Sequence, residues 1–146
     1  MRNHGKLLLA VDLAPESGPL IDRTRNLYAD DLEQLHVVHV LKKGMYDLQP
    51  ANDSSEDPAH TQRLRDHTSI KLRELLNLHG IEVAAEKIFV TFGEPANEIK
   101  RLAAEICAET VIIGSHCKES GWLKLPGATT NCVIQGISSD VVAVRV

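Results

Sequence analysis

The sequence predicts an α/β fold: a doubly wound five-stranded parallel sheet with helices on both faces. Three observations support this fold class. The 146 residues fit one domain. Short apolar runs of strand length alternate along the chain with amphipathic stretches of helix length, which is typical of β-α-β units. The first apolar run lacks polar alternation, as expected for a strand buried on both faces. We therefore expect 1–146 to form a single domain.

The first half of the chain supplies two strands and two helices. Residues 6–12 and 35–41 are apolar runs that predict the first two strands. Between them, apolar residues at helical spacing over 20–28 predict an amphipathic helix. Residues 42–60 are rich in Gly, Pro, Asn and Asp and predict a mobile loop, either a plain connection or a lid over a ligand. A second helix is expected over 61–79, because helical periodicity returns there and a glycine follows.

The second half of the chain continues the alternation. Residues 81–91 predict the third strand, and the Gly-Glu-Pro sequence at 93–95 predicts the start of the third helix, with proline in its first turn. The fourth strand is expected over 110–114, a short helix near 128–136, and the last strand over 140–146.

Composition narrows the classes of partner. Aromatic residues make up 3% of the chain and its net charge is −4, so the sequence lacks both the stacking surface and the positive charge that nucleic-acid binding needs. Cys107, Cys117 and Cys132 form no CxxC pair, which predicts free thiols in a reducing compartment. No signal peptide or membrane-length apolar run is evident. We expect a cytoplasmic protein that binds neither nucleic acid nor membranes.

The fold class predicts where a ligand would bind. In open parallel sheets, ligands lie beyond the carboxyl ends of the strands, at the point where the strand order reverses. The two common orders are 2-1-3-4-5 and 3-2-1-4-5, and the second makes strands one and four neighbours there. That order would bring Asp12 beside the loop that begins at Gly114. Asp12 is expected either to accept hydrogen bonds from a base or ribose, or to cap the following turn.

The loop from Gly114 to Gly127 is the second half of this predicted site. A glycine-bearing loop that leads into a helix can hold phosphate on its backbone N–H groups, and Lys118 and Lys124 would add positive charge. The alternative is an ordinary strand-to-helix connection, since two glycines thirteen residues apart are a weak signal. Neither a GxxxxGK[ST] nor a GxGxxG motif is present.

The remaining polar candidates predict no catalytic or metal site. His36 and His39 are three residues apart on a strand and should point to opposite faces of the sheet. His116 is expected to be an exposed loop residue, and Trp122 a packing anchor. Because no Ser/His/Asp or Cys/His arrangement is evident, no catalytic nucleophile is expected.

Four segments, in this order, resemble the universal stress protein family: residues 9–17, 39–40, 93–95 and 111–116. The resemblance covers essentially the whole chain and is closest to the universal stress protein A type. It implies the sheet order 3-2-1-4-5 and a homodimer formed through the C-terminal strand. Residues 141–146 are apolar enough for such an edge to pair with its twin.

The resemblance also implies a nucleotide site. Nucleotide-binding members of the family carry Gly-x-x-Gly, nine residues, and then Gly followed by Ser or Thr. Here the outer glycines match, but Cys117 and Ala128 replace the second glycine and the hydroxyl residue. A Cβ at Cys117 would obstruct the approach of phosphate, and the lost hydroxyl is worth about 0.5–1.5 kcal/mol. The site residues that the resemblance implies are Asp12, Val40, Gly114, Gly127 and Thr129.

Two functional hypotheses follow from the resemblance. The first is a stress-response protein: a non-enzymatic homodimer with weak or no nucleotide binding that acts through an unidentified protein partner. The alternative is a sensor in which ATP or AMP occupies the site and regulates assembly or a partner. A third hypothesis, ATP hydrolysis, has little support because no general base or metal-ligand set is evident. No metal and no catalytic residue are expected.

Overall fold

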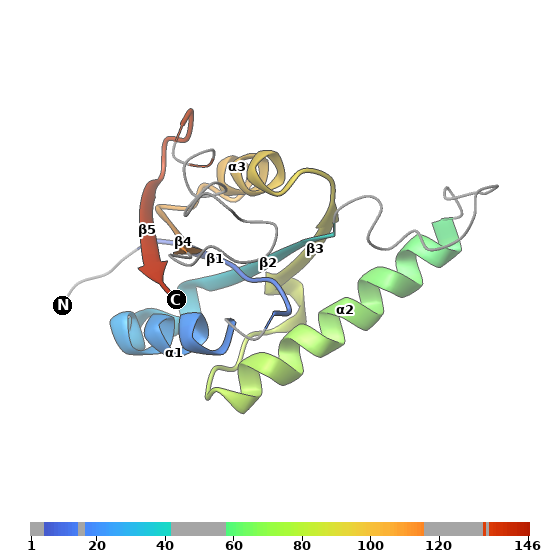
Figure 1. The fold of residues 1–146 in the computed structure, drawn as a ribbon, viewed down its shortest axis with the longest axis horizontal. Coiled ribbons are helices and arrows are strands. Elements are labelled where there is room, and N and C mark those ends of the chain that lie inside the picture. Colours follow the sequence, from blue (N-terminus) through green and yellow to red (C-terminus); the bar gives the residue numbers. More distant parts are fainter. Residues whose placement is uncertain (1–4, 15–16, 42–57, 116–132, 134) are drawn as a thin grey trace.

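The computed structural model describes residues 5–14, 17–41, 58–115, 133 and 135–146. Five parallel strands form one sheet in the order β3-β2-β1-β4-β5, with helices on both faces (Figure 1). The predicted fold class is therefore confirmed, and so is the order that makes β1 and β4 neighbours. The elements are β1 (Leu7–Ala10), α1 (Ser17–Leu27), the 3-10 helix η1 (Ala29–Gln34), β2 (Leu35–Leu41), α2 (Pro58–Leu78), the 3-10 helix η2 (Ala85–Lys87), β3 (Ile88–Phe92), α3 (Pro95–Glu105), β4 (Thr110–Ser115) and β5 (Asp140–Arg145).

The central strand β1 explains why its sequence is apolar without alternation. Leu7, Leu8 and Leu9 are all completely buried, because β2 and β4 flank the strand and helices cover both of its faces. Leu7 and Leu9 pack into the core beneath α1 and α2. Leu8 enters the core beneath α3. Successive side chains of a strand point to opposite faces, so each core layer requires an apolar residue from β1.

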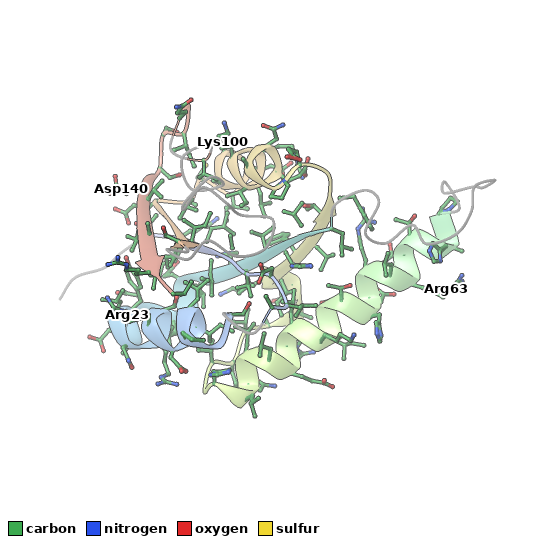
Figure 2. All side chains as sticks on the ribbon, viewed as in Figure 1. Arg23, Arg63, Lys100 and Asp140 are labelled. Carbon is green, nitrogen blue, oxygen red and sulfur yellow. The ribbon has the colours of Figure 1, made fainter. Side chains whose placement is uncertain are left out.

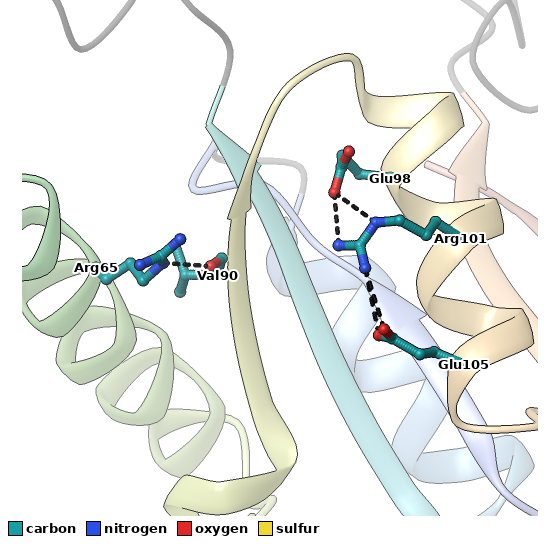
Figure 3. A network of polar contacts seen from close by, with 5 residues as sticks. All are labelled: Arg65, Val90, Glu98, Arg101 and Glu105. Atoms are coloured by element: carbon teal, nitrogen blue, oxygen red, sulfur yellow. Dashed lines mark hydrogen bonds and ion pairs between the residues drawn. The ribbon is translucent and has the colours of Figure 1, made fainter. Parts of the chain in front are cut away.

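Arginines on the helices bind backbone and carboxylate groups (Figure 3). Arg65 of α2 donates from Nε to the Val90 carbonyl of β3 at 3.2 Å, and its guanidinium lies 5.0 Å from the Phe92 ring centre. On α3, Arg101 contacts Glu98 at 2.7 Å and Glu105 at 3.3 Å. The α3 ion pairs are exposed and contribute little to stability. Figure 2 shows other charged side chains pointing outward: Arg23, Arg63, Lys100 and Asp140.

The structure corrects several predicted boundaries: β1 ends at Ala10 and not at residue 12, and α1 begins at Ser17 and not at residue 20. The third strand was expected over 81–91, but β3 begins only at Ile88. Ile81 and Val83 are buried in the core without belonging to a strand, so their apolar character reflects burial rather than strand pairing. Helix α2 begins at Pro58, so residues 58–60 are helical and not part of the predicted loop. Proline suits the first position of a helix, where its missing N–H has no partner to lose.

Other parts of the predicted organisation lie outside the described residues. This applies to 42–57, the rest of the predicted mobile loop, and to most of the helix expected near 128–136. Val133 from that segment is helical and fully buried in the core beneath α3. Gly80 ends α2 with a φ of +83°, a left-handed conformation that confirms the predicted stop. Within the described ranges, no helix is long and apolar enough to cross a membrane.

Candidate functional site

The register of the sheet places the predicted site residues at one edge. Ala10 of β1 pairs with Val38 of β2 and with Ile113 of β4. Asp12 follows Ala10 by two residues, and Val40 follows Val38 by two. Gly114 is the residue after Ile113. Because parallel strands end at the same side of a sheet, these three residues lie together at its carboxyl edge.

Asp12 is exposed and caps the turn that follows β1. Its Oδ1 accepts the N–H of Ala14 at 3.1 Å and the hydroxyl of Ser17 at 3.0 Å. The Ser17 hydroxyl also contacts the backbone oxygen of Asp12. No hydrogen bond to Oδ2 comes from the described residues. The capping role is therefore present, and it leaves one carboxylate oxygen available to a ligand.

The chain that carries Asp12 is held by His39. This residue is 8% exposed, and its Nδ1 lies 2.8 Å from the Val11 carbonyl oxygen. Because a carbonyl only accepts hydrogen bonds, Nδ1 must carry the proton. His39 thus fixes the first residue after β1 and, through it, the position of Asp12.

His36 lies on the other face of the same strand, which confirms the predicted separation of the two histidines. Its ring stacks on Phe89, with centroids 6.3 Å apart and planes inclined by 17°. Its Nδ1 lies 3.0 Å from the Gln34 carbonyl oxygen. Burial lowers the pKa of His36, so the imidazole resists protonation. Among the described residues, no group of three or more His, Cys, Asp or Glu side chains could hold a metal ion.

Thr91 is a polar residue at this edge that the sequence analysis missed. It pairs with Val40 in the β2–β3 register, so the two side chains share the face covered by α3. The Thr91 Oγ1 is buried, and no described residue forms a hydrogen bond with it. A buried hydroxyl without a partner is unusual and calls for an explanation. The available signal was a single hydroxyl residue in an otherwise apolar strand.

The structure tests little of the predicted phosphate loop. Gly114 lies within β4 and does not have a positive φ. A Cβ added there would be 3.5 Å from both Leu20 and Val146, an ordinary contact. Neither backbone conformation nor space therefore requires this glycine among the described residues. The other loop residues singled out by sequence lie outside them: His116, Cys117, Lys118, Trp122, Lys124, Gly127, Ala128 and Thr129.

The sheet, the helices on its two faces and the polar residues at its carboxyl edge define a doubly wound α/β fold with a candidate site at the strand ends. The sequence matches the model described as "Universal stress protein family" over residues 3–145. The chain belongs to the universal stress protein family.

Similar proteins support this assignment. "Universal stress protein A homolog 1" of Coxiella burnetii is 28% identical over 144 residues, covering 94% of each chain. "Universal stress protein A homolog 2" of the same organism is 26% identical over 152 residues, covering 100% of this chain and 98% of its own.

Solved structures share the fold at lower identity. Hypothetical protein MJ0577 superposes with a TM-score of 0.74 at 19% identity, covering 99% of this chain and 98% of its own. A universal stress protein in complex with cAMP gives 0.60 at 13% identity, covering 99% and 98%. The protein from Archaeoglobus fulgidus in complex with dAMP gives 0.55 at 17% identity, covering 97% and 98%.

Proposed function

We propose that this chain is a cytoplasmic stress-response protein of the universal stress protein A type. It acts as a homodimer without catalysing a reaction, and it binds adenine nucleotides weakly or not at all. The family and the names of the two Coxiella relatives support the stress-response role. The observation that carries the dimer is the outer edge of β5, which pairs with β4 and with no second strand in the part of the chain that the structure describes.

The backbone of β5 indicates which groups a second copy would meet. The N–H of Asp140 donates to the Glu109 carbonyl at 2.9 Å, and the N–H of Val146 donates to the Ser115 carbonyl at 3.1 Å. Successive N–H groups of a strand point in opposite directions, so the N–H of Ala143 faces away from β4. The Ala143 side chain is also exposed. A paired strand from a second copy would therefore use this donor.

The substitution Ala143→Pro tests the interface without disturbing the β4–β5 ladder. Proline removes an N–H that the monomer does not use, and it is tolerated on edge strands. We expect light scattering after size exclusion to change from dimer to monomer, while circular dichroism keeps the wild-type spectrum. Ala143→Thr retains the N–H and should remain a dimer. A folded Ala143→Pro variant that is as dimeric as the wild type would place the interface elsewhere. Val144, 3% exposed, is unsuitable for this test because a charge there would enter the core.

The nucleotide part of the proposal is based on the carboxyl edge of the sheet. Asp12 keeps Oδ2 available, Val40 lies at the same edge, and two related structures hold cAMP and dAMP. Gly114, Gly127 and Thr129 are the proposed phosphate-side residues. Weak binding is expected because Cys117 adds a Cβ where the family pattern has glycine, and Ala128 lacks a hydroxyl.

Calorimetry with ATP and magnesium tests this part. The double substitution Cys117→Gly with Ala128→Ser should tighten binding by about one or more powers of ten, at roughly 1.4 kcal/mol for each factor of ten. If the affinity stays at the wild-type value, these two positions do not limit binding.

The second candidate function is an ATP- or AMP-responsive sensor, favoured by the cAMP and dAMP complexes of related proteins. It requires tight occupancy. A ligand at 100 times its dissociation constant stabilises a protein by about 2.7 kcal/mol. Thermal melting with millimolar ATP and magnesium would then show a clear rise, whereas the first proposal predicts little change. A parallel phosphate-release assay tests for ATP hydrolysis, which neither proposal expects.

A further inference from the structure

An open pocket of about 490 Å³ lies between the β1–α1 connection and the C-terminal half of α2. Helices α1 and α2 cover one face of the sheet, whereas Val40 faces the core beneath α3. The pocket therefore lies on the other side of the sheet from Val40, although its lining residue Ala14 donates to the Asp12 carboxylate. Its lining residues are Leu13, Ala14, Gly18, Lys71, Leu75 and His79.

His79 is held in one orientation at this pocket. Its Nδ1 lies 2.9 Å from Oδ1 of Asp22 on α1. An ionised carboxylate only accepts hydrogen bonds, so Nδ1 carries a proton and Nε2 is the ring nitrogen left for a ligand. A Cβ at position 18 would lie 3.0 Å from the His79 Cε1 and 3.2 Å from Nε2. Gly18 therefore provides the space that lets the imidazole lie against the first turn of α1.

The charges around the pocket favour an anion. Arg25 lies 3.4 Å from Asp22 and also donates to the His79 carbonyl, so the Asp22 carboxylate is already matched by a cation. Lys71 is exposed and makes no ion pair with the described residues. Among the described residues that line the pocket, Lys71 thus supplies the positive charge and His79 one imidazole nitrogen.

Leucines supply the apolar part of the pocket lining. Leu13 is 42% exposed, and Leu75 is only partly buried against the core. Leu78 lies one helical turn beyond Leu75, on a neighbouring part of the same face, and is 79% exposed. Exposed leucines beside a cation suit a ligand that has one charged end and one apolar end.

We propose that this pocket binds a small organic anion with an apolar body, with an aliphatic carboxylate as the simplest case. The carboxylate would lie beside the Lys71 ammonium and the Nε2 of His79. The aliphatic chain would lie on Leu13 and Leu75.

Titration of the ¹⁵N-labelled protein with octanoate, followed by NMR, tests the proposal. We expect saturable shifts in the amide signals of Leu13, Ala14, Gly18 and residues 71–80. Lys71→Gln should weaken binding about tenfold, because it removes a charge-assisted contact. The matched control is Arg73→Gln, an exposed cation two residues along the same helix, which should leave the affinity unchanged.

Octanol has the same apolar tail without the charge and should bind more weakly than octanoate. Three outcomes would overturn the proposal: equal binding of octanol and octanoate, equal affinity of Lys71→Gln and Arg73→Gln, or shifts confined to Asp12 and Val40. The last outcome would assign the anion to the strand-end site instead. Because the experiment uses no nucleotide, its result does not depend on the function proposed above.

Discussion

The two roles of Asp12 can be separated by two substitutions. Asp12→Ala removes the side-chain oxygen that accepts hydrogen bonds from the Ala14 N–H and the Ser17 hydroxyl. Asp12→Asn keeps an oxygen at that position but removes the negative charge. The cap needs only the acceptor, whereas a ribose or base that donates hydrogen bonds gains more from a carboxylate.

The size of the capping effect follows from the two hydrogen bonds. One is exposed and the other part-buried, so their combined loss is expected to cost about 1–2 kcal/mol. For a chain of this length, that corresponds to a decrease in Tm of about 2–8 °C in scanning calorimetry. Asp12→Asn should lower the Tm much less than Asp12→Ala, because asparagine caps nearly as well as aspartate.

The same two variants test the ligand role by calorimetric titration with ATP. If Asp12 contacts the nucleotide, Asp12→Asn should weaken binding while leaving the Tm close to the wild-type value. To make a weak affinity measurable, both substitutions are also introduced into the Cys117→Gly, Ala128→Ser background. An Asp12→Ala variant with unchanged Tm would refute the capping argument. If Asp12→Asn binds ATP with the wild-type affinity, the negative charge of Asp12 does not contribute to nucleotide binding.

Three further predictions concern stability. Ile112→Ala should lower the free energy of unfolding by about 2–5 kcal/mol in urea titration, because Ile112 is fully buried in β4, next to the central strand; an unchanged midpoint would contradict its place in the core. Gly80→Ala should lower the free energy of unfolding by about 1–2 kcal/mol, because alanine is strained at a φ of +83°. Leu78→Ala, at an exposed position, should change the free energy of unfolding little. Burial lowers the pKa of His36 below its usual 6.5, so the unfolded chain takes up the proton first as the pH falls. Stability should therefore decrease below about pH 6.5, and His36→Phe, which keeps the stacking on Phe89, should show a shallower decrease; an equal slope would refute this contribution.

Much of the fold could be predicted because its signals are local. β2 matches the expected range 35–41, and α3 begins with the expected proline at position 95. The third strand was overextended because Ile81 and Val83 are as apolar as strand residues. Ile81 and Val83 are buried because of the path that the chain takes between the end of α2 and the start of β3. Periodicity reports that a residue is buried but not whether its backbone pairs with a neighbouring strand.

The two ligand regions differ in what the sequence could reveal. Asp12 follows an apolar strand, so the general rule for parallel sheets was enough to place it at the carboxyl edge. The contact between His79 and Asp22 joins residues 57 apart in sequence and depends on how α1 and α2 pack together. Helical periodicity predicts which face of each helix is buried, but not how far one helix is shifted along the other. His79 is the last residue of the expected helix 61–79, and helical spacing places it near Leu75 and Leu76 without indicating which residue of α1 it contacts. Only packing reveals that Gly18 provides the space in which the His79 ring reaches Asp22.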